Sequence, residues 1–187
     1  MSSTRPQARP GAEGFTAIEL MVVVAILAVL TTLATPSFNL IIERWRVRQT
    51  VEALQSTLQY ARSEAVRRGG GVFIQKLPQG TNGCTLAAQH ADWGCGWVVF
   101  ADRNGNRHWD PKEELQRFDT PARTLVTRSR SASIISVDRW GQLGGLTAMG
   151  FAIAPSPAGI TSAATQGICV SSGGRIRVVG QEGIPCA

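Results

Sequence analysis

The chain has 187 residues, a formal net charge of +6, and 43% hydrophobic and 17% charged residues. Long charge blocks, internal repeats and low-complexity tracts are absent from the sequence, which argues against repeat and disordered classes. The two histidines, His90 and His108, lie in polar, turn-like stretches and belong to no recognisable nucleophile–base or metal-ligand pattern. The sequence therefore predicts a protein that is not an enzyme.

An apolar run near the start of the chain is the most informative segment. From Phe15 to Ala34 there are 20 residues and one charge, Glu19. A helix rises about 1.5 Å per residue, so this run is long enough for the roughly 30 Å hydrocarbon core of a bilayer. A carboxylate in such a segment is costly without a partner, which marks Glu19 as functional. The alternative is an ordinary signal-anchor helix whose Glu19 reaches the membrane interface.

The residues before this run carry a family resemblance. A secretory signal has its small-residue cleavage site after the apolar run, whereas Gly14 stands before it and follows a leader with Arg5 and Arg9. A Gly followed by Phe15, with Glu19 as fifth residue of the mature chain, resembles the class III signal of type IV pilins and pseudopilins. The resemblance covers Gly14 to about Phe38, although Ala17 departs from the usual Leu.

The resemblance implies a maturation and an assembly step. A membrane prepilin peptidase would cut between Gly14 and Phe15 and methylate the new amine of Phe15. Glu19 would then face the positive N-terminus of a neighbouring subunit, because pairing offsets the cost of both charges in lipid. The protein would lie in the bacterial inner membrane as a single-pass protein with its globular domain in the periplasm, and would enter a pilus or pseudopilus with other pilins or pseudopilins.

The helix is predicted to continue past the apolar run. Pro36 should bend or break it, because proline lacks a backbone N–H. Beyond Pro36 the apolar residues follow steps of four and three, which places them on one helical face: Val47, Val51, Leu54, Leu58, Ala61 and Ala65. The triplet Gly69-Gly70-Gly71 predicts the helix end. The expected organisation is a leader at 1–14, a transmembrane anchor at 15–38, an amphipathic continuation at 39–70 and a globular domain at 71–187.

The rest of the chain predicts short strands between turns. The candidate strands are Val72–Lys76, Gly96–Phe100, Glu114–Phe118, Ser133–Val137, Gly150–Ala154, Gly167–Ser171 and Arg175–Val179. The predicted fold class is α+β, with the long helix packed on an antiparallel β-rich domain. Five aromatic residues are expected in its core: Trp97, Phe100, Phe118, Trp140 and Phe151.

Four cysteines, Cys84, Cys95, Cys169 and Cys186, predict disulfides in an exported domain. Three connectivities are open. We favour Cys84–Cys95 and Cys169–Cys186, because each pair is close in sequence. Zinc binding is the rival interpretation, and the absence of a Cys-x-x-Cys pair disfavours it.

The segment from Asp102 to Glu113 offers a weak calcium candidate, and no other cofactor is expected. Oxygen-bearing side chains stand at the EF-hand ligand positions: Asp102, Asn104, Asn106, Asp110 and Glu113. Gly105, however, is one position too early for the sharp turn, and a strand rather than a helix precedes the loop. The alternative is a turn in which Asp and Asn side chains cap backbone amides.

The C-terminal region is locally basic and contains Gly174-Arg175-Ile176-Arg177. In a strand, Arg175 and Arg177 share one face while Ile176 faces the core. Two guanidinium forks side by side suit phosphates rather than base edges, which predicts sequence-independent DNA binding. Arginines 123, 128, 130 and 139 lie nearby in sequence, and we expect Arg123, Arg128 and Arg130 to support the contact. An exposed basic hairpin without a ligand is the alternative.

The order of anchor helix, Gly-Trp-Val-Val-Phe strand, Asp-x-Asn-x-Asn turn and late Gly-Arg-x-Arg resembles the FimT/GspH-type branch of the pilin superfamily. In FimT-type minor pilins of competent bacteria, a C-terminal Gly-Arg-x-Arg is associated with binding of incoming DNA. Gly174, Arg175 and Arg177 match that motif. The resemblance implies a minor pilin for natural transformation. The alternatives are a GspH-like pseudopilin of a type II secretion system, without DNA binding, and a purely structural pilus-priming subunit.

Overall fold

The computed structural model describes residues 14–144 and 148–186, apart from the side chains of 33–37. The leader residues 1–13, with Arg5 and Arg9, lie outside the described residues. The chain divides into two compact units, residues 1–39 and 40–187, and helix α1, Ala17–Arg68, contributes to both. The predicted stop is confirmed, because Gly69 has a φ of +76° and the N–H of Gly70 donates to the carbonyl of Ala65 at 2.8 Å.

The first unit contains the beginning of α1. Thr16 precedes the helix, and its Oγ1 accepts a hydrogen bond from the N–H of Glu19 at 3.3 Å. The helix runs through Pro36 without interruption, so a break at this residue is not found. Proline removes one hydrogen bond of the ladder, and the turns on either side keep theirs. Within the described ranges, no helix is both long enough and apolar enough to cross a membrane.

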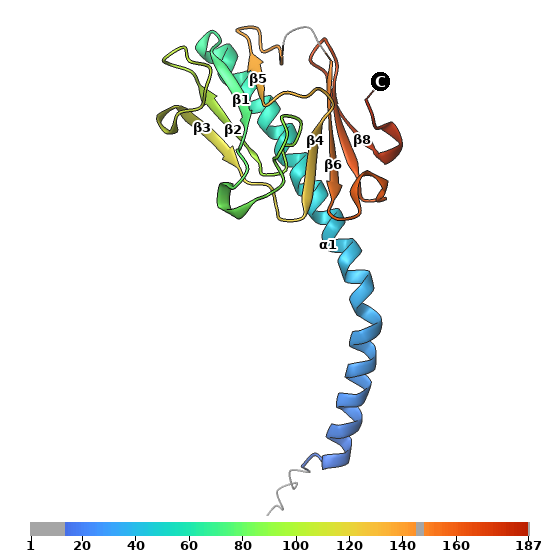
Figure 1. Cartoon of the computed structure of the whole chain (residues 1–187). Helices are drawn as coiled ribbons and strands as arrows, with labels where there is room; N and C mark the ends of the chain where they lie inside the picture. The colour runs from blue at the N-terminus through green and yellow to red at the C-terminus, as the bar shows by residue number, and fades with distance from the viewer. Residues whose placement is uncertain (1–13, 145–147, 187) are drawn as a thin grey trace, which may run out of the picture. The chain divides into compact units, whose positions relative to one another are not determined.

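The second unit contains two antiparallel four-stranded sheets, drawn on the left and right of Figure 1. The first sheet has the order β3-β2-β1-β5 and the second has the order β4-β6-β7-β8. The strands are β1 Val72–Lys76, β2 Trp97–Ala101, β3 Glu114–Phe118, β4 Thr124–Arg128, β5 Ile134–Val137, β6 Met149–Pro155, β7 Gln166–Val170 and β8 Ile176–Gly180. Short 3-10 turns lie at Thr81–Gly83, Pro111–Glu113, Gly159–Thr161 and Gln181–Gly183.

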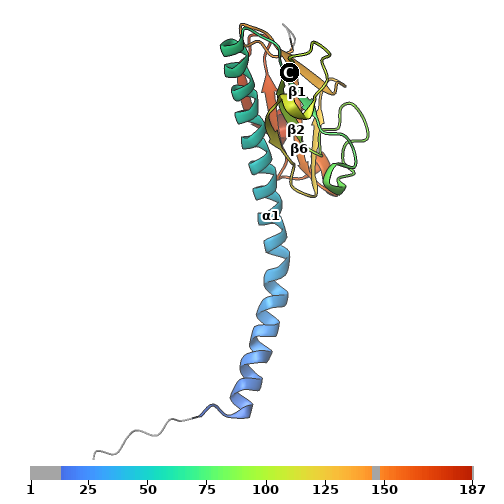
Figure 2. The same ribbon diagram turned by 90° about the vertical axis from the view of Figure 1, so that its left-hand side faces the viewer.

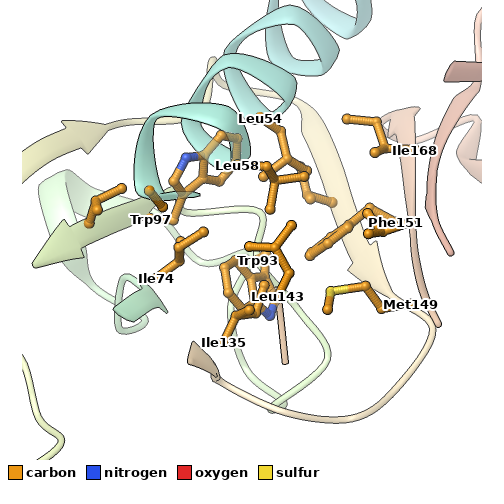
Figure 3. Close-up of a cluster of buried hydrophobic side chains, with 14 of the residues drawn as sticks. Leu54, Leu58, Ile74, Trp93, Trp97, Ile135, Leu143, Met149, Phe151 and Ile168 are labelled. Atoms are coloured by element: carbon orange, nitrogen blue, oxygen red, sulfur yellow. The ribbon is translucent and has the colours of Figure 1, made fainter. Parts of the chain in front are cut away.

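The C-terminal part of α1 lies along the strands of this unit (Figure 2), and its predicted apolar face forms the centre of the core. Leu54 and Leu58 are fully buried between side chains from both sheets (Figure 3). The indole N–H of Trp97 donates to the hydroxyl of Thr57 at 3.0 Å, which satisfies the polar atom that this ring carries into the core. A helix packed on antiparallel sheets is the predicted α+β fold, and this prediction is confirmed.

Two features differ from the sequence-based expectation. Strand β4 was not predicted; burial alternates along it, with Thr124, Val126 and Arg128 buried and Leu125 and Thr127 more exposed. Trp140 was expected in the core, but it is 76% exposed, whereas Trp97, Phe100 and Phe151 are buried. Phe118 packs against the cluster that contains Trp97 and Phe151. Hydrogen bonds to Asp138 fix the turn at residues 138–142, and this turn holds Trp140 outside.

Candidate nucleic-acid interface

The Gly-Arg-x-Arg segment begins in the turn between β7 and β8, with Gly174 and Arg175, and continues into β8, with Ile176 and Arg177. The N–H of Gly174 donates to the carbonyl of Ser171 at 2.8 Å, and the N–H of Arg175 donates to the Ser171 hydroxyl at 3.1 Å. Gly174 has a φ of +79°, a conformation that side chains other than glycine rarely adopt. Arg62 of α1 donates from Nη1 to the carbonyl of Gly174 at 2.8 Å, which fixes the turn to the helix. These hydrogen bonds close the turn and connect it to helix α1.

The two arginines of the segment are exposed and Ile176 is not. In the register of β7 and β8, Ile176 lies opposite Val170, and Arg177 lies opposite Cys169. Ile176 packs against the core, which is the alternation that the sequence predicts, while Arg175 and Arg177 remain exposed. Neither guanidinium forms an ion pair within the described part of the chain. Both forks are thus available to an external anion.

A cavity of about 200 Å³ lies beside Arg177, between the start of β6 and the Cys169–Cys186 disulfide. The Ser129 hydroxyl accepts a hydrogen bond from the N–H of Gly150 at 2.9 Å, and the Ser171 hydroxyl accepts one from Arg175. Neither hydroxyl donates to an acceptor in residues 14–144 and 148–186, so both retain a hydrogen for a ligand. No described lining residue carries a carboxylate side chain. This cavity favours an anion.

The three supporting arginines have different environments. Arg130 is exposed and follows β4 at the end of the second sheet where the β7–β8 turn lies. Arg123 is also exposed, but it precedes Thr124, which pairs with Pro155 at the opposite end of that sheet. The expectation that Arg123 supports the contact is therefore corrected by the strand register.

The expectation that Arg128 supports the contact is also wrong. Its side chain is buried, with the residue 7% exposed, and its Nη1 donates to the carbonyls of Ala132 and Ile134 at 3.3 and 3.0 Å. The guanidinium lies 5.9 Å from the centre of the Trp93 ring. Burial lowers the pKa of this guanidinium. Arg128 holds the β4–β5 connection to the core and cannot reach a phosphate.

The end of α1 lies beside Arg139, and its own arginines, Arg67 and Arg68, are paired with a carboxylate. A Cβ placed on Gly70 would lie 3.5 Å from the backbone N of Arg139, so the loop after β5 packs on the helix end. Arg67 and Arg68 pair with Glu64 at 2.6 and 2.8 Å, and these hydrogen bonds lower the pKa of Glu64 to about 2. We define the basic end as the surface formed by Arg130, Arg139, Arg175 and Arg177.

The calcium candidate is not supported. Asp102 accepts the N–H groups of Gly105 and Arg107 through its two oxygens, at 2.8 and 3.0 Å. The amides of Asn104 and Asn106 donate to Asp110, and Glu113 accepts the N–H of Arg103. Among the described residues, no group of three or more His, Cys, Asp or Glu side chains is placed to hold a metal ion. Oxygens of Asp102, Asp110 and Glu113 that were expected as ligands accept hydrogen bonds within the turn, whereas the buried Oε2 of Glu113 has no hydrogen-bond partner among the described residues.

Both disulfides join the cysteines that are closest in sequence. Cys84 is bonded to Cys95 and Cys169 to Cys186, and no free cysteine remains. The zinc interpretation is therefore wrong. His90 and His108 are exposed, as expected for residues without a catalytic role.

The residues of the predicted maturation site are exposed within the first unit. Phe15 is 82% exposed, and a Cβ on Gly14 would meet no atom within 4 Å. Glu19 is exposed, and its carboxylate has no hydrogen-bond partner in the part of the chain that the structure describes.

Comparison with known families matches residues 50–174 to the family of the type II transport protein GspH. The chain belongs to this family. GspH-type proteins are type IV pilin-like minor pilins and pseudopilins, which are structural subunits rather than enzymes. Among curated proteins, the pilin-like protein PilA1 of Thermus thermophilus is 35% identical over 102 residues. The match covers 54% of this chain and 56% of PilA1, so it spans about half of that relative.

Solved structures agree with the GspH-type fold. The type IV minor pilin FimU of Pseudomonas aeruginosa, in two crystal forms, superposes with TM-scores of 0.55 and 0.57 at 23% identity. The two matches cover 75% and 77% of this chain and 98% and 96% of the FimU chains. At this identity the likeness shows the fold alone.

Sequence reasoning missed several residues at or beside the basic end. Arg62 was not expected at the site, yet its guanidinium donates a hydrogen bond to the carbonyl of Gly174. Ser129 and Ser171 carried no recognisable signal, because serines are common in turns. Trp140 did carry one: the segment Asp138-Arg139-Trp140-Gly141 has the Asp and Gly of a capped turn, which predicts exposure of the residues between them.

Proposed function

We propose that this GspH-type subunit is a FimT-like minor pilin that binds the phosphate backbone of DNA through the basic end, in support of natural transformation. The observation that carries the proposal is the pair of exposed, unpaired guanidinium groups of Arg175 and Arg177 on a turn that Arg62 fixes. A fixed turn favours binding, because little conformational entropy is lost when the ligand arrives. The serine hydroxyls beside Arg177 supply further donors for phosphate oxygens.

The same proposal includes maturation and assembly. Prepilin peptidase would cut after Gly14, and the inner membrane would hold the apolar segment that begins at Phe15. Glu19, which has no described partner, would pair with the N-terminus of a neighbouring pilin in the filament. Mass spectrometry of the mature chain tests the first step, because an N-methylated Phe15 is the expected N-terminal residue.

DNA binding is tested by fluorescence anisotropy with the full chain in a non-ionic detergent. We expect salt-dependent binding of duplex DNA without sequence preference. The variant Arg175→Ala with Arg177→Ala should bind more weakly, and the slope of log K against log salt should fall by about 0.9 for each phosphate that the variant no longer neutralises. Unchanged affinity in this variant would remove the site from consideration.

A matched control distinguishes the loss of a specific site from the loss of net positive charge. Arg103 and Arg107 are exposed in the Asp102 turn. Their double replacement by Ala removes the same two charges from residues outside the basic end, and we expect it to lower DNA affinity less than the replacement of Arg175 and Arg177 does. An equal loss in both double variants would indicate general electrostatic attraction rather than a site.

The alternative is a minor pseudopilin of a type II secretion system, which the description of the matched family favours. It predicts no DNA binding by the wild-type chain even at low salt, together with a secretion defect on deletion. A purely structural pilus-priming subunit would also bind no DNA, but its deletion would abolish pili.

A further inference from the structure

Trp140 is the most exposed tryptophan among the described residues, at 76%, and it lies next to the basic end. Large aromatic side chains supply much of the stability of a core, so leaving one in solvent forgoes that stabilisation. No ring contact or core cluster includes Trp140 within the described ranges. Stability of the fold therefore does not explain why Trp140 is exposed.

The turn that carries Trp140 is closed by several hydrogen bonds. Asp138 Oδ1 accepts the N–H of Trp140 at 2.9 Å and that of Gln142 at 2.8 Å, and the N–H of Gly141 donates to the Asp138 carbonyl at 2.9 Å. Gly141 has a φ of +76°, which closes the turn. These hydrogen bonds constrain the backbone on both sides of Trp140, and the side chain is exposed to solvent.

The Trp140 turn and the Gly174 turn meet at one helix residue. A Cβ on Gly141 would lie 3.6 Å from Cβ of Arg62, and the guanidinium of Arg62 donates to the carbonyl of Gly174. Arg62 thus joins the turn that presents Arg139 and Trp140 to the turn that presents Arg175. The exposed indole of Trp140 and the guanidinium groups of Arg139 and Arg175 are therefore carried by two turns that contact the same helix residue.

We propose that Trp140 is a stacking platform for an unpaired base, and that the basic end binds single-stranded DNA in preference to duplex DNA. This inference rests on the proposed DNA binding and specifies its substrate. Bases of a duplex stack on each other and are not accessible to a flat side chain, whereas every unpaired base offers a face to an indole. The arginines around Trp140 contact phosphates on either side of that base, and the positive surface selects a nucleic acid over a neutral partner.

The test compares an unpaired oligodeoxythymidine with a duplex of equal length, using the full chain in detergent. The variant Trp140→Ala should lower affinity for the single strand about tenfold, the decrease expected for one stacked base. Affinity for the duplex should change by less than about twofold, because phosphate contacts remain. Trp140→Phe should retain most of the single-strand affinity. Since Trp140 is exposed, these variants should keep the wild-type circular dichroism spectrum.

A matched control is available in the same chain. Trp45 is 62% exposed on α1, and Trp45→Ala should leave both affinities unchanged. Binding of the single strand should quench tryptophan fluorescence in the wild type and in Trp45→Phe, but much less in Trp140→Phe.

The outcomes separate this inference from the proposed function. If the wild type binds neither oligonucleotide, both are wrong. If it binds both, and Trp140→Ala leaves both affinities unchanged or lowers them equally, stacking is overturned while phosphate binding stands. A Trp140→Ala variant with unchanged affinity but defective filament assembly would identify Trp140 as a contact between subunits and overturn the inference.

Discussion

The Asp102–Glu113 turn and the basic end both place several polar residues on a loop beside a sheet, yet they differ in how those residues are satisfied. In the turn, both oxygens of Asp102 accept backbone N–H groups, and Asn104 donates to Asp110. At the basic end, Arg175 and Arg177 have no ion-pair partner among the described residues. The same density of polar side chains therefore stabilises a loop in one region and leaves binding capacity free in the other.

The contrast gives a physical criterion for separating structural from binding residues. A polar group that is satisfied inside the protein gains little from a ligand, because binding would first break its hydrogen bonds. An exposed guanidinium without a partner exchanges only water for a phosphate. Substitutions at particular residues of the two regions can test whether this criterion holds.

Replacing Arg128 and replacing Arg177 should give the largest difference in the free energy of unfolding. Arg128→Ala removes a buried guanidinium that bridges two carbonyls, and we expect the free energy of unfolding to fall by about 3 kcal/mol. Arg177→Ala should change it by less than about 0.5 kcal/mol, because that side chain is exposed. Urea denaturation measures both values. Equal decreases in the two variants would show that exposure does not separate their roles.

Asp102→Ala should produce the next largest effect. It removes the acceptor of two backbone hydrogen bonds, and we expect the free energy of unfolding to fall by about 2 kcal/mol. DNA affinity of the folded variant should equal that of the wild type. Asp102→Asn keeps one acceptor oxygen and should recover part of the stability. A weaker DNA affinity in Asp102→Ala would mean that the turn and the basic end are not independent.

The regular parts of this fold follow from periodicity, which explains why they could be predicted. The stripe from Val47 to Ala65 repeats at helical spacing and is buried in the structure. Strands β1 and β3 have the predicted bounds, with Gly71 and Pro78 near the ends of β1 and Pro111 and Pro121 near the ends of β3. Strand β4 was not predicted, and burial of its last residue, Arg128, depends on Trp93, which is distant in the chain, and on the carbonyls of Ala132 and Ile134.

The candidate site could be predicted only in part, for a related reason. A short motif identifies Arg175 and Arg177, but the surface around them depends on contacts across the chain. Arg62 reaches Gly174 over a separation of 112 residues, and no local pattern encodes that contact. Arg123 and Arg130 are similar in sequence context, and only the register of β4 with β6 places them at opposite ends of the sheet.

Glu64 should give a small, pH-dependent effect. Hydrogen bonds from Arg67 and Arg68 lower its pKa to about 2, from a usual value of 4.5. A lowered carboxyl pKa means that the stabilisation is fully present above pH 4.5 and disappears as the pH falls towards 2. Because these pairs lie on a helix surface, we expect about 0.5 kcal/mol. Glu64→Gln should remove this part of the acid destabilisation, measured by urea denaturation at several pH values. An identical pH profile in the variant would contradict the assignment.

Calcium should not change the stability of the folded chain. This makes calcium addition the strictest test of the hydrogen-bonded Asp102–Glu113 turn. If the Asp102–Glu113 loop bound calcium with a Kd of about 1 mM, then about 10 mM calcium would stabilise the folded chain by about 1.4 kcal/mol. We expect the thermal midpoint to be the same in calcium, in magnesium and in a chelator, because a cation would have to displace the N–H groups that Asp102 already accepts. A rise in the midpoint that is specific to calcium and absent in Asp102→Asn would show that satisfied oxygens can still be recruited, and the criterion drawn from the two regions would then fail.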